Sequence, residues 1–152
     1  GLEEWCDSPV GVLAYLILTD QFPRNMFRGE ARSFATDALA LAAAAKAIAN
    51  DLDQQIAEPQ RQFFFLPFMH SESLVEQERG VQFLATRLPQ TGAGNLLHAK
   101  VHREIIRRYG RFPYRNAALG RTDTAAERAF ADGGGYASIL REIEAEQTKT
   151  TP

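Results

Sequence analysis

Apolar residues recur along this chain with the spacing of helices. A predicted helix over 31–49 has apolar residues at every third or fourth position, which defines one helix face. They are Phe34, Ala38, Leu41, Ala45 and Ile48. A second helix, over 74–88, repeats this pattern with Leu74, Val81, Leu84, Ala85 and Leu88. No segment alternates apolar and polar residues between turn signals, so we predict no strand.

The first strong helix signal indicates a central, buried element. Ser8 supplies an N-cap oxygen, and Pro9 suits the first helical turn. Residues 9–21 are apolar on nearly every side, which is typical of a buried helix. Pro23 lacks a backbone N–H, so this helix is expected to end before it.

Capping signals divide the rest of the chain into further helices. Ser73 and Thr124 are each followed three residues later by Glu, which is the capping box of a helix start. Asn95 is expected to cap another helix, and Gly110 to end it. A short aromatic helix after Pro59 and a last helix over 136–147 complete the series.

Length and composition place these helices in one all-α domain. The chain of 152 residues can bury a core without disulfides or metals. We predict six or seven mostly antiparallel helices over 1–147 and a polar tail over 148–152. The single cysteine, Cys6, favours a reducing, cytoplasmic compartment. The longest apolar run, over 12–18, is too short to span a membrane.

The net charge of −2 indicates no function, but the arginines are unevenly distributed. Six of them lie between 103 and 121, where Glu104 is the only acidic residue. Such a stretch can attract an anion, a nucleic acid or an acidic partner. The overall acidic balance argues against a dedicated nucleic-acid binder.

Two segments have similar sequences. FPRN at 22–25 recurs as FPYRN at 112–116, and a further arginine follows each copy. Asp20, at the expected end of the first helix, needs a cation such as Arg24 or Arg28 because the helix dipole disfavours its charge. The resulting pair could line a pocket or could only fix the turn. The sequence leaves open whether the two segments face each other.

The histidines are the candidates for acid–base chemistry. His70 and Glu72 are close together in a loop, and His98 and His102 are one helical turn apart, a spacing that metal ligands can use. Two histidines on an apolar helix face are also typical of a satisfied core pair. No HExxH sequence, cysteine set or phosphate-binding glycine motif occurs, so we predict neither a metal nor a cofactor. Glu78 projects beside an apolar face and therefore needs a cationic partner or a ligand.

An ordered series of short sequences runs from about residue 5 to residue 130. It includes DQFPRNMFRG at 20–29, FATDA at 34–38, LPFMHSE at 66–72 and YGRFPYRN at 109–116. This series resembles the bacterial domain-of-unknown-function family 924. The resemblance implies a tetratricopeptide-repeat-like helical fold and brings no established activity. Members of that family usually carry a helical stretch ahead of Trp5, which the resemblance implies is missing here.

Three functions remain open. The first is a helical binding module whose polar pocket holds a small anion or an acidic peptide. Its candidate ligand-binding residues are Asp20, Arg24, Asn25, Arg28, Gln77, Glu78, Arg111, Arg115 and Asn116. The second is a small-molecule enzyme with His70 or His102 as general base and Glu72 or Glu78 as the orienting carboxylate. The third is a protein–protein scaffold without chemistry.

Overall fold

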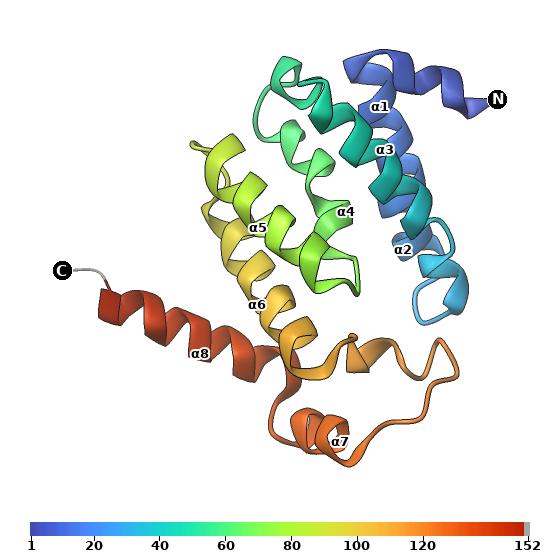
Figure 1. Cartoon of the computed structure of the whole chain (residues 1–152). Coiled ribbons are helices and arrows are strands. Elements are labelled where there is room, and N and C mark those ends of the chain that lie inside the picture. The colour runs from blue at the N-terminus through green and yellow to red at the C-terminus, as the bar shows by residue number, and fades with distance from the viewer. Residues whose placement is uncertain (151–152) are drawn as a thin grey trace.

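The computed structural model describes residues 1–150, including every side chain among them except that of residue 3. Within this range the chain forms helices and turns and no strand (Figure 1). The α-helices are α1 (Pro9–Leu16), α2 (Phe22–Met26), α3 (Asp37–Ala49), α4 (Leu66–Met69), α5 (Leu74–Arg87), α6 (Ala93–Tyr109), α7 (Ala125–Asp132) and α8 (Gly135–Thr150). The prediction of a single all-α domain is confirmed.

Two apolar clusters form the core. The larger one joins α1, α3, α4 and α5 around Phe64, Phe65 and Phe68, which are all fully buried. The smaller one lies between α6, α7 and α8, and Phe112 is its largest fully buried side chain. In Figure 1, α4 lies between the α1–α3 side and the α5–α6 pair, and α7 and α8 lie at the far end from the N-terminus. The C-terminal end of α4 therefore faces the boundary between the two clusters.

The first helix does not end before Pro23, so that prediction was wrong. After α1, a π-helical turn over Ile17–Gln21 leads directly into α2, which contains Pro23. Proline leaves the carbonyl of Thr19 without its helical N–H partner, but the Thr36 hydroxyl donates to that oxygen instead. The chain therefore stays helical through Asp20, which lies inside the π-helical turn.

Three local capping signals were confirmed. Ser8 Oγ accepts from the N–H of Gly11, and Thr124 forms its capping box with Glu127. Gly110 ends α6 in the left-handed conformation, with a φ of 70°.

Two capping predictions were wrong. At Ser73 no capping bond forms, since the carboxylate of Glu76 pairs with Arg79 at 2.9 Å. Asn95 lies inside the first turn of α6, which begins at Ala93, and its amide donates to Gln62 Oε1 at 3.0 Å.

The buried helix faces differ in part from those predicted. In α3 the buried residues are Ala40, Ala44, Ala47 and Ile48. Ala38, expected inside, is exposed, because alanine on every side of α3 leaves its apolar pattern without a unique face. In α5, Leu74 and Ala85 are exposed as well. Around α1 burial is one-sided, since Val10 is 69% exposed while Leu16 is fully buried.

The C-terminal helix is longer than predicted. It continues through Thr150, so residues 148–150 of the expected polar tail are helical, and residues 151–152 lie outside the described range. No helix in the described part of the chain is long and apolar enough to cross a membrane.

Candidate functional site

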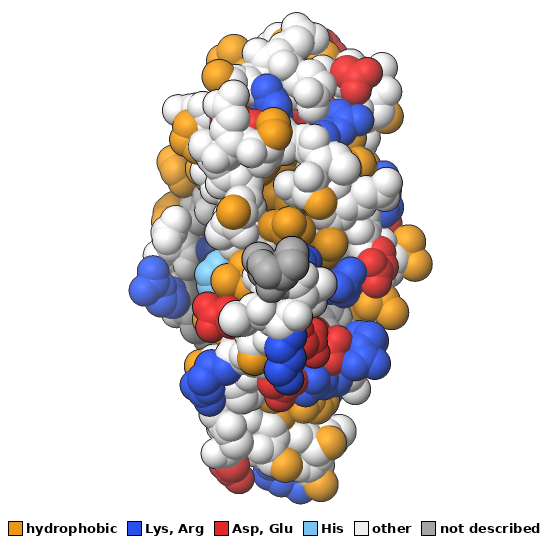
Figure 2. Space-filling model, turned by 90° about the vertical axis from the view of Figure 1, so that its left-hand side faces the viewer, with side chains coloured by type: hydrophobic (Ala, Val, Ile, Leu, Met, Phe, Trp, Pro, Cys, Tyr) orange, Lys and Arg blue, Asp and Glu red, His pale blue; other side chains and the backbone are white. Residues whose placement is uncertain are grey.

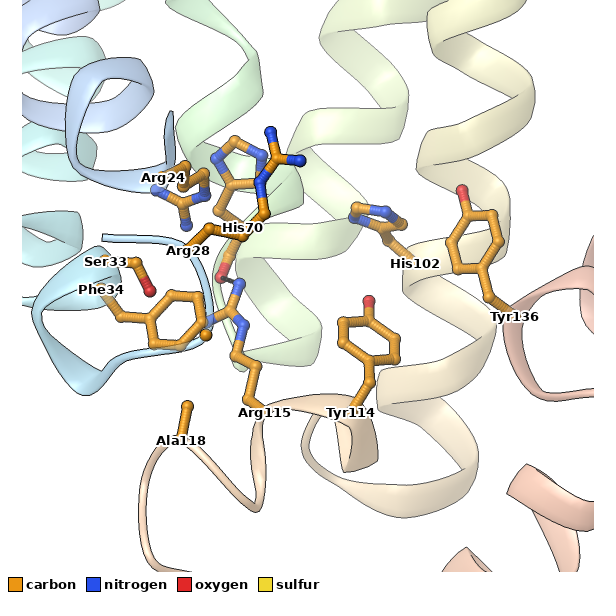
Figure 3. A pocket seen from close by; sticks show the side chains of 11 residues that line it. Arg24, Arg28, Ser33, Phe34, His70, His102, Tyr114, Arg115, Ala118 and Tyr136 are labelled. Atoms are coloured by element: carbon orange, nitrogen blue, oxygen red, sulfur yellow. Dashed lines mark hydrogen bonds between the residues drawn. The ribbon is translucent and has the colours of Figure 1, made fainter. Parts of the chain in front are cut away.

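A cavity of about 500 Å³ opens at the boundary between the two core clusters (Figure 3). Residues far apart in the sequence meet there, from α2 and the segment after it, from the end of α4, from α6, from the turn after Phe112 and from the start of α8. The lining residues are Arg24, Arg28, Gly29, Ser33, Phe34, His70, His102, Tyr114, Arg115, Ala118 and Tyr136. The structure thus brings five of the residues predicted for a site around one cavity: Arg24, Arg28, His70, His102 and Arg115.

A buried carboxylate orients His70 from behind the cavity. Asp20 is 1% exposed, and its Oδ1 lies 2.7 Å from His70 Nδ1. Burial alone would raise the pKa of Asp20, but the hydrogen bond with His70 and the positive charge of Arg24 hold that pKa below its ordinary value. An ionised carboxylate can only accept hydrogen bonds, so His70 Nδ1 carries a proton and donates it to Asp20. The remaining ring nitrogen, Nε2, faces away from this pair.

The backbone around His70 is held by side chains from two other elements. Gln77, on α5, donates its amide N–H groups to the carbonyls of Met69 and Ser71 at 2.8 and 2.7 Å. Arg115 donates to the carbonyl of His70 itself at 2.8 Å, as Figure 3 shows. Three consecutive carbonyls are therefore occupied. Gln77, which was predicted to bind ligand, lies beneath the site and does not line the cavity.

His102 presents the same tautomer to the cavity. Its Nδ1 lies 2.7 Å from the carbonyl of Met69, which can only accept, so Nδ1 is the protonated nitrogen. Burial lowers the pKa of His102 to about 4, and the ring is neutral at pH 7. Among the described residues, Gln77 Oε1 is the single buried side-chain nitrogen or oxygen without a hydrogen-bond partner. The unbonded Nε2 atoms of His70 and His102 are therefore accessible to solvent.

The three arginines of the cavity differ in how fully they are paired. Arg24 forms a two-pronged pair with Asp37, with both N–O distances at 2.8 Å. Arg115 is 8% exposed, stacks between the rings of Phe34 and Phe112 at 4.5 and 4.6 Å, and lies 3.6 Å from Asp37. Arg28 is exposed and makes no hydrogen bond or ion pair with any other residue that the structure describes.

Three aromatic side chains complete the lining of the cavity. Tyr114 and Tyr136 line the cavity, and Phe34 lies beneath Arg115. Burial raises the pKa of Tyr136 to about 12 and raises that of Tyr114 as well, so both hydroxyls stay protonated at neutral pH. Sequence reasoning did not place these three residues in a site. Tyr114 had a signal, since it stands within the second FP segment, whereas Tyr136 had none.

The other predicted residues of the second segment form a closed network beside the cavity. Arg111 pairs through two nitrogens with Glu127 at 2.6 and 2.8 Å. The amide of Asn116 donates to Asp123 at 2.7 Å and accepts from Arg121 at 2.9 Å. None of these side chains lines the cavity.

Glu72 belongs to the same network. Arg121 donates to it through two nitrogens at 2.8 and 2.9 Å, and the backbone N–H of Phe112 donates at 2.8 Å. Burial alone would raise the pKa of Glu72, but these bonds and the charge of Arg121 lower it below its ordinary value. The carboxylate that orients His70 is therefore Asp20, and Glu72 anchors the second segment.

Two further candidates lie on the outer surface. Glu78 is 57% exposed on α5, and Arg103 is its cationic partner at 3.1 Å. Asn25 is exposed, and its amide donates to the carbonyl of Gln21 at 3.1 Å.

The arginine-rich stretch is largely neutralised on the protein surface. Arg107 and Arg108 both pair with Glu104, and Arg108 also pairs with Glu142 on α8. Figure 2 shows positive and negative side chains side by side on the face that carries the C-terminal end. His98, one turn before His102, bonds to the Tyr136 hydroxyl, whereas His102 bonds to the carbonyl of Met69. Among the side chains that the structure describes, no group of three or more His, Cys, Asp or Glu residues could hold a metal ion.

Comparisons with known proteins identify relatives of this chain. A solved structure from Agrobacterium tumefaciens, described as protein of unknown function ATU0120, is 43% identical and superposes with a TM-score of 0.80. The match covers 88% of this chain and 73% of that one. No curated protein matches the chain. The model of the family described as "Bacterial protein of unknown function (DUF924)" matches residues 1–135, and this chain therefore belongs to that family.

Proposed function

We propose that the cavity binds a small organic anion, in which a carboxylate or phosphate is attached to an apolar or aromatic group. The observation that carries this proposal is the charge arrangement at the cavity. Three guanidinium groups line it, while the two carboxylates that face them, Asp20 and Asp37, are outside its lining. Arg28 has no acidic partner within the described residues and is the first contact for an anion.

Arg115 supports the same proposal from the floor of the cavity. Its burial and the nearby charge of Arg24 lower the pKa of Arg115 below its ordinary value. Arg115 donates one hydrogen bond, to the carbonyl of His70, and pairs with Asp37 at 3.6 Å, but its other guanidinium N–H groups donate no hydrogen bond to any residue that the structure describes. A bound anion would supply the acceptors that this buried cation lacks.

The shape and chemistry of the cavity favour a small molecule. Its volume of about 500 Å³ lies within the range of small-molecule sites, and Phe34, Tyr114 and Tyr136 offer flat apolar surface. An acidic peptide and a protein scaffold are the alternatives. The tetratricopeptide-repeat-like description of the fold stays a prediction.

The test is calorimetric titration of the protein with inorganic phosphate, phenyl phosphate, benzoate and succinate. We expect at least one organic anion to bind and Arg28→Gln to weaken it about tenfold, because one charge-assisted hydrogen bond is lost. Arg32→Gln is the matched control, since Arg32 stacks on Phe27 nearby and does not line the cavity. Equal losses in both variants would indicate a general charge effect, and absence of binding by the native protein would refute the proposal.

A further inference from the structure

We propose that this cavity is catalytic and that His70 is a general base, which activates water to hydrolyse a small ester carrying a phosphate or carboxylate group. This inference rests on the proposed anion binding and adds a reaction to it. It starts from the two imidazole rings, which a simple anion-binding site would not need.

The histidines present acceptors to a cavity whose arginines attract anions. Nδ1 of each ring is bonded away from the cavity, to Asp20 in one case and to the carbonyl of Met69 in the other. Nε2 of His102 carries a lone pair because burial keeps that ring neutral, and Nε2 of His70 carries one when its ring is in the neutral form that a general base requires. A lone pair repels a bound anion, and it is satisfied only by an O–H or N–H donor. The ring centroids of His70 and His102 are 6.5 Å apart, so both rings can contact one water or one hydroxyl group between them.

The two histidines are not equivalent. Behind His70 lies the ionised carboxylate of Asp20, which is 1% exposed and stabilises the imidazolium that forms when Nε2 takes a proton. Behind His102 lies a neutral carbonyl, and burial keeps that ring neutral. His70 is therefore the proton acceptor, and His102 is an acceptor that orients the water.

His70 is also held more firmly than a surface histidine. Its side chain is fixed by Asp20, its own carbonyl by Arg115, and the carbonyls on either side by Gln77. This arrangement fixes the direction of Nε2, which general-base catalysis requires. Asp20 and Gln77 act through His70 and are positioning residues.

The attacking group must be water, because the described lining offers no activated nucleophile. Ser33 is 3% exposed, and its hydroxyl donates to the carbonyl of Glu30 at 2.5 Å. Tyr114 and Tyr136 have raised pKa values and keep their protons. Cys6 lines a different cavity, beside α1 and α3.

The reaction balances without a co-reactant other than water. His70 Nε2 takes a proton from water while the water oxygen forms a bond to the acyl carbon or to phosphorus. The bond from that atom to the ester oxygen breaks, and the imidazolium of His70 returns the proton to the departing alcohol oxygen. The products are an alcohol and a free acid, while Asp20 remains ionised throughout. Arg28 and Arg115 hold the anionic group and offset charge that develops on the reacting oxygens.

The experiment measures release of 4-nitrophenol from three probes: 4-nitrophenyl phosphate, mono(4-nitrophenyl) succinate and the neutral 4-nitrophenyl acetate. We expect one of the two anionic probes to be hydrolysed, with kcat/KM falling about 100-fold in His70→Gln. The probe that reacts distinguishes phosphate from carboxylate esters. Arg103→Gln, on the same helix as His102 and outside the cavity lining, is the control and should retain activity, because Arg103 pairs with Glu78 on the outer surface.

Asp20→Asn tests the positioning role and also serves if His70→Gln does not fold. It should lower kcat about tenfold or more, leave KM within about twofold, and change the acid limb of the pH–rate profile. A purely structural role for Asp20 would change stability without this separation of kcat from KM.

Three outcomes would overturn the inference. If the native protein binds phosphate or succinate but hydrolyses no anionic probe faster than folded His70→Gln, the catalytic role fails and the proposed binding function stands. If turnover occurs but is unchanged in both His70→Gln and Asp20→Asn, another group is the base. If calorimetry detects no anion and no probe reacts, both proposals fail together.

Discussion

The two segments with similar sequences use their charged residues in opposite ways. The first, around Arg24 and Arg28, leaves one guanidinium group unpaired at the rim of the cavity. In the second, from Arg111 to Arg121, most polar side chains form hydrogen bonds and ion pairs with neighbouring side chains. Among its polar side chains, only Tyr114 and Arg115 line the cavity. The same residue types therefore form an open site in one place and a closed network in the other.

The difference follows from the number of acceptors within reach. Near the second segment, Glu72, Asp123 and Glu127 satisfy Arg111, Asn116 and Arg121. Near the first, Asp20 and Asp37 are occupied mainly by Arg24 and His70, so nothing remains for Arg28. A polar residue in a shared sequence pattern is thus a candidate ligand contact only where its neighbours leave it unsatisfied.

The largest effect on stability is expected for Asn116→Ala, which removes the centre of the closed network. Asn116 is 2% exposed and bonds to Asp123, Glu127 and Arg121. We expect the free energy of unfolding to fall by about 3 kcal/mol, because the change removes a buried amide that bonds to three side chains and leaves a cavity in its place. Anion affinity should stay within about twofold. Denaturant unfolding and calorimetry measure the two quantities.

Asn25→Ala is the matched control for that change. Asn25 is exposed and bonds only to a carbonyl one turn earlier, so its loss should change the free energy of unfolding by less than about 0.5 kcal/mol. A stable Asn116→Ala protein that no longer binds anions would instead place Asn116 in the site.

The free energy of unfolding is expected to depend on pH through His102, which lines the open site. His102 has its pKa lowered from 6.5 to about 4, so between these values the unfolded chain binds more protons than the folded protein. The contribution of neutral His102 is therefore complete above pH 6.5 and is lost as pH falls toward 4. The loss should be on the order of 2–3 kcal/mol.

The measurement compares native protein with His102→Gln by denaturant unfolding at several pH values. The difference between the two free energies of unfolding should shrink as pH falls from 6.5 to 4, which separates His102 from the other titrating groups. A constant difference across this range would mean that His102 titrates normally and is not held neutral by burial.

The smallest effect is expected for an ion pair outside both regions. Glu142 is 48% exposed and joins α8 to Arg108, which also pairs with Glu104. Glu142→Gln should lower the free energy of unfolding by less than about 0.5 kcal/mol, because exposed pairs are well solvated. Urea unfolding at low and high salt checks this. A loss above about 1 kcal/mol would show that this pair holds α8 in place.

The fold could be predicted as far as its signals were local. The N-cap at Ser8, the capping box at Thr124 and the left-handed Gly110 each depend on atoms within four residues. The predictions at Asn95 and Pro23 were wrong because distant residues decide the structure there. Gln62 bonds to Asn95, and Thr36 bonds to the carbonyl that Pro23 leaves without a partner. In α3, alanine on all sides left the buried face undetermined until neighbouring helices covered it.

The sequence alone established an all-helical domain, and it predicted that Asp20 pairs with a nearby cation, Arg24 or Arg28, of which Arg24 forms the pair. Three features of the site became known only from the tertiary structure. Asp20 orients His70, which lies fifty positions later, and Arg115 donates to the carbonyl of His70. Glu72 belongs to the closed network. The physical reason is one of range. Helices form through bonds between residues three to five positions apart, whereas a cavity forms where packing of the core brings distant segments together.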